Sequence, residues 1–130
     1  MGLHHSAAII IQDQKVLFIK RSTLEDSEPN KWCAPNETLK ENESPESAVV
    51  RGVQEELGLR FVISKQLSNH SYLGHTTFVF LGTAEGEIVP NPDEVAEYAW
   101  FTYTDAMRLE FAYGYDKVIK NLHNLALLAD

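Results

Sequence analysis

The stretch at residues 37–59, ETLKENESPESAVVRGVQEELGL, carries the strongest structural signal in this chain. It predicts a helix that starts after Ser44, because a hydroxyl cap followed by Pro45 at the first helical position is a common helix start. Gly58 predicts the end of the helix, since glycine readily takes the left-handed conformation found there. Between these positions, apolar residues at every fourth position form one stripe, which consists of Val49, Val53 and Leu57.

The opposite side of the predicted helix is polar and acidic. At about 3.6 residues per turn, this side carries Arg51, Gly52, Glu55 and Glu56. Two adjacent carboxylates could hold a divalent cation, because Mg²⁺ prefers oxygen ligands and often takes only one or two carboxylates, with phosphates and water completing its shell. The alternative is an acidic face that is simply solvated. Because Gly52 has no side chain, we expect a gap in the middle of this face.

The same stretch resembles the Nudix box. The family pattern is a glycine, five residues, a glutamate, seven residues, Arg-Glu, an aliphatic residue, any residue, Glu-Glu, any residue, a glycine and an aliphatic residue. The positions that match are Glu43, Arg51, Val53, Glu55, Glu56, Gly58 and Leu59. Two positions depart from the pattern: Glu37 replaces the first glycine, and Gly52 replaces the glutamate after the arginine. The resemblance implies an α/β fold, the Nudix α/β/α sandwich, built on a mixed, curved β-sheet.

The resemblance also implies roles for residues of the box. Glu55 and Glu56 would be ligands of Mg²⁺ or Mn²⁺, and Arg51 would hold a box glutamate in place. The family ordinarily has a carboxylate at the position of Gly52, where it serves as a metal ligand or base. Its loss leaves three outcomes open: another carboxylate such as Glu94 or Glu37 replaces it, the enzyme is slow, or the chain only binds its ligand.

Further site residues are predicted outside the box helix. Arg21 ends a strand at the place where the family often directs an arginine toward phosphates, which its planar fork can bind through two parallel bonds. Glu94, in DEVAEYAWF, is the candidate for a catalytic carboxylate, with Glu97 next. Glu37 lies at a position that faces the substrate phosphates, where it could bind the metal or obstruct the substrate.

Two asparagines near the box stand where the family usually has glycine. These are Asn36 and Asn42. Glycine serves there because the loop must adopt positive φ, and asparagine is the other residue that tolerates this conformation well. We therefore expect both asparagines to preserve the shape of the loop.

The remaining chain predicts mostly strands. Residues 6–11 and 16–19 form a predicted hairpin around Asp13 and Gln14. Further predicted elements are short strands at 60–64 and 66–72, a buried central strand at 76–83, a last strand at 97–103 and a helix at 115–128.

Composition limits the kind of partner. The chain of 130 residues predicts one domain, 1–130, and its formal net charge of −8 argues against a nucleic-acid polymer or an anionic membrane as partner. A small phosphorylated substrate remains compatible, since a bound metal can reverse the sign of an acidic cleft. The single cysteine, Cys33, excludes an internal disulfide and predicts a reducing, cytoplasmic location. A homodimer is left open.

Three functions remain open at this point. The favoured one is a metal-dependent hydrolase that cleaves the pyrophosphate bond of a nucleoside diphosphate derivative. The second is a non-catalytic, nucleotide-binding Nudix domain. The third is other chemistry on the same fold, for which two relatives with incomplete boxes are models: isopentenyl diphosphate isomerases, which have a cysteine shortly before the box as Cys33 is here, and GDP-mannose mannosyl hydrolases, which attack a sugar carbon. Candidate bases for this glycosyl hydrolase chemistry are His70, His75 and His123.

Overall fold

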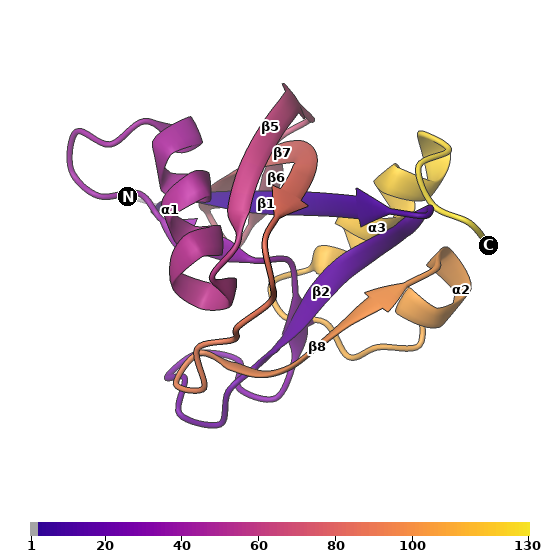
Figure 1. Cartoon of the computed structure of the whole chain (residues 1–130), viewed down its shortest axis with the longest axis horizontal. Coiled ribbons are helices and arrows are strands. Elements are labelled where there is room, and N and C mark those ends of the chain that lie inside the picture. Colours follow the sequence, from indigo (N-terminus) through magenta and orange to yellow (C-terminus); the bar gives the residue numbers. More distant parts are fainter. Residues whose placement is uncertain (1–2) are drawn as a thin grey trace.

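The structure is a computed structural model that describes residues 3–130 (Figure 1). Its elements in chain order are β1 (His4–Gln12), β2 (Lys15–Arg21), β3 (Trp32–Cys33), β4 (Asn36–Thr38), α1 (Pro45–Leu57), β5 (Arg60–Gln66), β6 (His70–Tyr72), β7 (His75–Glu85), β8 (Val95–Phe101), α2 (Tyr103–Ala106) and α3 (Tyr115–Asn124). No helix among these residues has the length and apolar character required to cross a membrane.

The strands form one mixed, curved and open sheet. Its main path runs β3–β2–β1–β7–β5, while β4 pairs with β1, β6 with β7 and β8 with β2. β1 and β7 are parallel, and the other pairs are antiparallel. α1 packs against β1, β4 and β5, and α3 covers the other side of the sheet. This is the α/β/α sandwich that the sequence predicted.

The hairpin of β1 and β2 starts the fold as predicted. Asp13 and Gln14 form the turn with φ angles of 54° and 61°, and Gln12 pairs with Lys15 across it. Two consecutive residues with positive φ match the right-handed twist of the flanking strands. The hairpin places Arg21 at the far end of β2, close to the loops that approach α1.

α1 has the predicted ends and the predicted buried stripe. The Ser44 hydroxyl accepts a hydrogen bond from the Ser47 amide at 3.1 Å, and Gly58 ends the helix with a φ of 68°. Val49, Val53 and Leu57 are at most 1% exposed. Burial of this stripe fixes the rotation of the helix and therefore the direction in which its carboxylates point.

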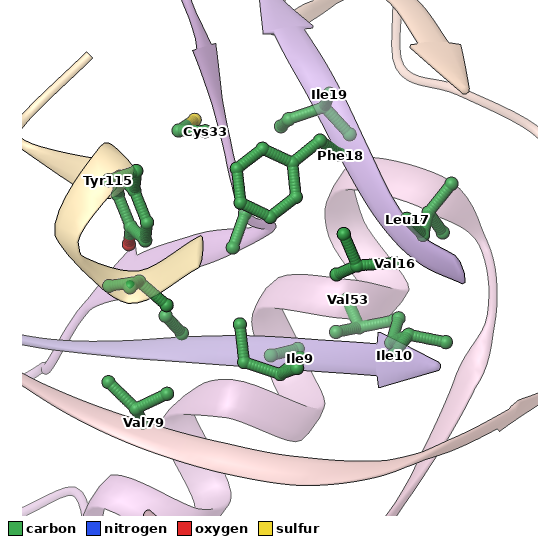
Figure 2. Close-up of a cluster of buried hydrophobic side chains, with 14 of the residues drawn as sticks. Ile9, Ile10, Val16, Leu17, Phe18, Ile19, Cys33, Val53, Val79 and Tyr115 are labelled. Carbon is green, nitrogen blue, oxygen red and sulfur yellow. The ribbon is translucent and has the colours of Figure 1, made fainter. Parts of the chain in front are cut away.

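The hydrophobic core joins α1 and α3 to the sheet (Figure 2). Phe18 of β2 meets Tyr115 of α3 edge to face, with ring centroids 6.0 Å apart. α3 ends at Asn124, earlier than the predicted end at residue 128. Ala126 takes a φ of 60° after the helix, and the chain turns back so that Leu128 is buried.

The last strand also differs from its prediction. β8 runs over Val95–Phe101, two residues before the predicted range at each end. Thr102 then caps α2 by accepting a hydrogen bond from the Asp105 amide at 3.3 Å. The helix therefore begins at Tyr103, because the Thr102 hydroxyl provides the hydrogen bond that an amide in the first turn of a helix needs.

Candidate active site

A cavity of about 450 Å³ lies where β4, the end of α1 and the loop before β8 meet. One part of its wall is charged and consists of Arg21, Glu25, Glu37, Glu56 and Glu94. The other part is aromatic and consists chiefly of His5, His70, Tyr72, His75, Tyr113 and Tyr115. We call these two parts the charged wall and the aromatic wall.

Glu56 is the most deeply placed carboxylate of the charged wall. It lies in the last turn of α1 and is only 5% exposed. One of its oxygens accepts a hydrogen bond from the Asn36 amide at 3.0 Å. Burial raises the pKa of Glu56 well above its ordinary value, and the nearby Glu94 and Glu37 raise this pKa further. A bound cation would reverse this effect by stabilising the charged form.

Gly52 does not leave a gap, so this prediction is wrong. A Cβ atom placed on Gly52 would lie 2.8 Å from the Cβ of Glu37, closer than such atoms approach in proteins. The Glu37 side chain thus occupies the space above Gly52. The part of the acidic face at Gly52 and Glu56 is consequently not solvated, because both residues are buried and Glu37 of β4 lies over Gly52.

Glu37 is held in place from two sides. It lies in β4 opposite Ser6 of β1, and one of its oxygens accepts a hydrogen bond from the Thr38 amide at 3.3 Å. Its other oxygen is 3.8 Å from a guanidinium nitrogen of Arg51. Burial raises the pKa of Glu37, and the carboxylates of Glu94 and Glu55 act in the same direction.

The two asparagines near the box behave differently. Asn42 has a φ of 63°, so it takes the place of a glycine as predicted. Asn36 is not among the residues with positive φ, and this part of the prediction is wrong. Asn36 lies in β4, where its side chain donates to the Ala34 carbonyl at 2.8 Å.

Arg51 connects three parts of the box. Its guanidinium donates to both Glu43 oxygens at 2.9 and 3.0 Å, and to the Thr38 carbonyl at 3.0 Å. It also donates to both Glu55 oxygens at 3.2 and 3.3 Å. Glu55 therefore points toward Arg51 and is 45% exposed in its side chain, and it is not among the residues that line the cavity.

The loop before β8 is fixed to the end of α1 through its main chain. The amides of Val89 and Asn91 donate to the carbonyls of Leu57 and Glu56, each at 2.8 Å. The Glu94 carbonyl accepts from the Ser22 amide at 3.0 Å. These bonds bring the Glu94 side chain into the charged wall, where burial and the carboxylates of Glu25 and Glu55 raise its pKa.

Glu97, the second candidate of this region, lies away from the cavity. Its carboxylate is 3.5 Å from the Lys20 ammonium, and the side chain is 61% exposed. It belongs to β8 and pairs with Lys20 across the sheet.

Arg21, for which phosphate binding is predicted, lines the cavity. Its guanidinium donates to Glu25 at 2.6 Å and to the Ser27 carbonyl at 3.0 Å, and it lies 5.0 Å from the ring centre of Tyr113. The Arg21 side chain is 12% exposed. It is therefore preoriented beside the carboxylates of the charged wall.

The aromatic wall was largely missed by the sequence reasoning. Tyr72 and Tyr113 face each other edge to face with ring centroids 6.4 Å apart. Nε2 of His70 is 2.8 Å from the Tyr113 carbonyl, and a carbonyl can only accept, so this nitrogen carries a proton. His75 also lies in the wall, 3.4 Å from His5. These residues come from distant parts of the chain, and no local motif marks them.

His123, a predicted candidate base, lies elsewhere. Its ring stacks on Tyr103 with centroids 3.8 Å apart, and its Nε2 is 2.7 Å from an Asp130 oxygen. It does not line the cavity.

The charged wall fits a hard divalent cation in its chemistry. Its carboxylates are oxygen donors, and the pKa values of Glu37, Glu56 and Glu94 are raised by burial and by neighbouring carboxylates, a repulsion that a cation would relieve. Within residues 3–130, no three acidic, histidine or cysteine side chains are grouped so that they could hold an ion as they stand. A cation would thus depend on one or two carboxylates together with water and substrate phosphates, which is usual for Mg²⁺.

Sequence comparison places this chain in a known family. The model of the NUDIX domain matches residues 2–122, and the chain belongs to this family. The chain is 30% identical over 120 residues to an isopentenyl-diphosphate Delta-isomerase of Ruegeria pomeroyi, a match that covers 82% of this chain and 67% of that protein. It is 35% identical over 57 residues to an 8-oxo-dGTP diphosphatase of Proteus vulgaris, covering 44% of this chain and 51% of that protein.

Solved structures show the same fold. The MutT NUDIX hydrolase of Burkholderia pseudomallei superposes with a TM-score of 0.80 at 23% identity, and the match covers 92% of this chain and 97% of that one. The prediction of a Nudix α/β/α sandwich is confirmed.

Proposed function

We propose that this chain is a Mg²⁺- or Mn²⁺-dependent hydrolase that cleaves the pyrophosphate bond of a nucleoside diphosphate derivative. The observation that carries this proposal is the charged wall, in which the buried Glu56 and the partly buried Glu37 and Glu94 share one cavity with the preoriented Arg21. Such a site offers oxygen ligands for a metal and a cation for the phosphate oxygens that the metal leaves free.

The residues divide the work of this reaction. Glu56 would hold the metal from inside the cavity, whereas Glu55 lies outside the cavity lining and adds negative charge beside Arg51. A bound metal would neutralise negative charge on the phosphate oxygens. Glu94 accepts the proton of the attacking water, since a raised pKa brings a carboxylate closer to the range of an effective base. Arg21 binds and orients the phosphates.

The aromatic wall supports a nucleoside as the organic part of the substrate. Tyr72 and Tyr113 offer ring surfaces with polar edges, which suit a flat, polar base. The name of the Proteus relative agrees with a nucleotide substrate. The net charge of −8 favours a small substrate over a nucleic-acid polymer, and with the single cysteine we propose a cytoplasmic location.

Isomerisation of isopentenyl diphosphate is the second candidate, because the Ruegeria relative carries that name. Against it, Cys33, the cysteine before the box, is fully buried and does not line the cavity. Burial also raises the pKa of its thiol to about 12, so it would neither donate nor accept a proton readily.

One assay separates these candidates. The protein is incubated with Mn²⁺ and a panel of nucleoside diphosphate derivatives, sugar nucleotides and isopentenyl diphosphate, and products are followed by ³¹P NMR. Hydrolysis of a pyrophosphate bond produces new phosphate signals, whereas isomerisation keeps the diphosphate intact and a glycosyl transfer to water releases the intact nucleoside diphosphate. We expect pyrophosphate cleavage. Binding of nucleotides without any turnover would instead support the non-catalytic domain.

A further inference from the structure

The two departures from the Nudix pattern, Glu37 and Gly52, meet in space. A Cβ on Gly52 would be 2.8 Å from the Cβ of Glu37 and 3.7 Å from its Cγ. The side chain of Glu37 therefore begins almost where a side chain at position 52 would begin. With the backbone as it stands, side chains at both positions would collide, so β4 or α1 would have to shift.

The backbone explains why glycine is dispensable at position 37. Glu37 lies in β4 and is not among the residues with positive φ, so a side chain there causes no backbone strain. What a side chain at this position needs is room above α1, and Gly52 provides it. The glutamate and the glycine have exchanged places across a single contact between β4 and α1.

We propose that Glu37 supplies, from β4, the metal-binding carboxylate that the Nudix pattern places on the helix at position 52. This inference rests on the proposed metal-dependent function and names a residue that takes over a task within it. The carboxylate that is missing at position 52 is then present at position 37.

The surroundings of Glu37 point to a ligand. Glu37 lines the same cavity as Glu56, a residue that is only 5% exposed and that accepts a hydrogen bond from the Asn36 amide at 3.0 Å. Arg51 lies 3.8 Å from Glu37, the same arginine that fixes Glu43 and Glu55. The Arg51 guanidinium is thus within ion-pair distance of Glu37 as well as of these two carboxylates.

The metal role is tested by calorimetric titration with Mn²⁺ alone. Glu37→Gln keeps the shape of the side chain and removes its charge, and we expect Mn²⁺ affinity to fall about tenfold or more, since even outer-shell partners of metal sites typically contribute 10–100-fold. Glu41→Gln is the matched control, because Glu41 is an exposed carboxylate of the adjoining loop. If wild type binds Mn²⁺ and Glu37→Gln binds it equally well, the inference is overturned while the proposed function stands. If wild type binds no Mn²⁺ and cleaves no substrate, the proposed function itself fails.

The exchange of positions is tested by a double-mutant cycle. We expect Gly52→Glu alone to lower the melting temperature, because its Cβ collides with Glu37. Glu37→Gly alone should weaken Mn²⁺ binding. The double variant Glu37→Gly/Gly52→Glu restores the family pattern and should recover both the melting temperature and Mn²⁺ affinity beyond what the single changes predict by addition. Simple additivity of both quantities would contradict the exchange.

Discussion

Glu94 and Glu97 are close in sequence and lie in different surroundings. Glu94 lines the cavity, whereas Glu97 pairs with Lys20 on the exposed side of β8. We predict that Glu94→Gln lowers kcat by about 10²–10⁴-fold, as the loss of a general base typically does. Its Mn²⁺ affinity should fall less than that of Glu56→Gln, because Glu56 is the proposed ligand.

Glu97→Gln is the control for this prediction and should keep nearly full activity. The two variants are compared by steady-state kinetics, and Mn²⁺ affinity is measured by calorimetry. A damaging Glu97→Gln with a silent Glu94→Gln would show that the base has been assigned to the wrong carboxylate.

Burial lowers the reactivity of the Cys33 thiol. Its thiol is fully buried, and burial raises its pKa to about 12. We predict that iodoacetamide at pH 8 modifies Cys33 very slowly in the folded protein and rapidly in urea, as followed by mass spectrometry. The folded state favours the neutral thiol of Cys33. The stability that this preference contributes is complete below the ordinary thiol pKa and is lost as pH rises toward 12. Rapid modification without urea would reopen the isomerase hypothesis.

At the scale of elements, Arg51 ties the loop before α1 to the helix. Hydrogen bonds from Arg51 lower the pKa of Glu43 to about 2, from an ordinary value of 4.5. A lowered folded-state pKa contributes stability that is present above the ordinary value and is lost as pH falls through about 2. We predict that Glu43→Gln melts at a lower temperature than wild type at pH 7, and that this difference disappears as pH approaches 2.

Calorimetric melting at a series of pH values measures this difference. Glu41→Gln, a change of the same kind at an exposed loop position, should show no such dependence. A difference between Glu43→Gln and wild type that is constant with pH would mean that the pair contributes through packing alone.

Elements with local signals could be predicted from the sequence. Ser44, Pro45 and Gly58 define both ends of α1, and the turn at Asp13 and Gln14 defines the first hairpin. Each of these rests on residues that are neighbours along the chain. The predicted ends of β8 and α3 were wrong. Thr102 caps a helix where the pattern predicted a strand, and Leu128 is buried by a turn of the chain where the pattern predicted helix.

Contacts between distant elements could not be predicted in this way. Glu37 and Gly52 could be recognised only as two separate departures from the Nudix pattern, because the sequence does not show that β4 contacts α1 at these two residues. The aromatic wall has the same origin, as Tyr72 and Tyr113 meet from β6 and from the loop before α3. The roles of the site residues and the assignment of residues 1–130 to one domain stay predictions.

At the scale of the whole molecule, the acidic charge links stability to metal binding. The net charge is −8, and several carboxylates of the charged wall lie within one cavity. We predict that Mn²⁺ at 100 times its dissociation constant stabilises the folded state by about 2.7 kcal/mol and raises Tm by several degrees. Scanning calorimetry measures the shift.

General screening of charge is separated from specific binding by a control salt. NaCl at the same ionic strength should raise Tm much less, because screening is not selective for one ion. The Mn²⁺ effect should also be reduced in Glu56→Gln. Equal shifts in the two salts would speak against a metal site in the cavity.

The attachment of the loop before β8 bears on how freely this region can change during evolution. Its bonds to the carbonyls of Leu57 and Glu56 come from the amides of Val89 and Asn91 and use no side chain of the loop. Many different residues can therefore occupy position 89, whereas Asn91 also shapes the loop with its side chain, whose Oδ1 accepts a hydrogen bond from the Asp93 amide at 3.1 Å. Proline fits neither position, because it has no amide hydrogen to donate. The outer surface of the loop is thus open to variation that could adapt the protein to new substrates, while the carboxylate of Glu94 stays where it is needed.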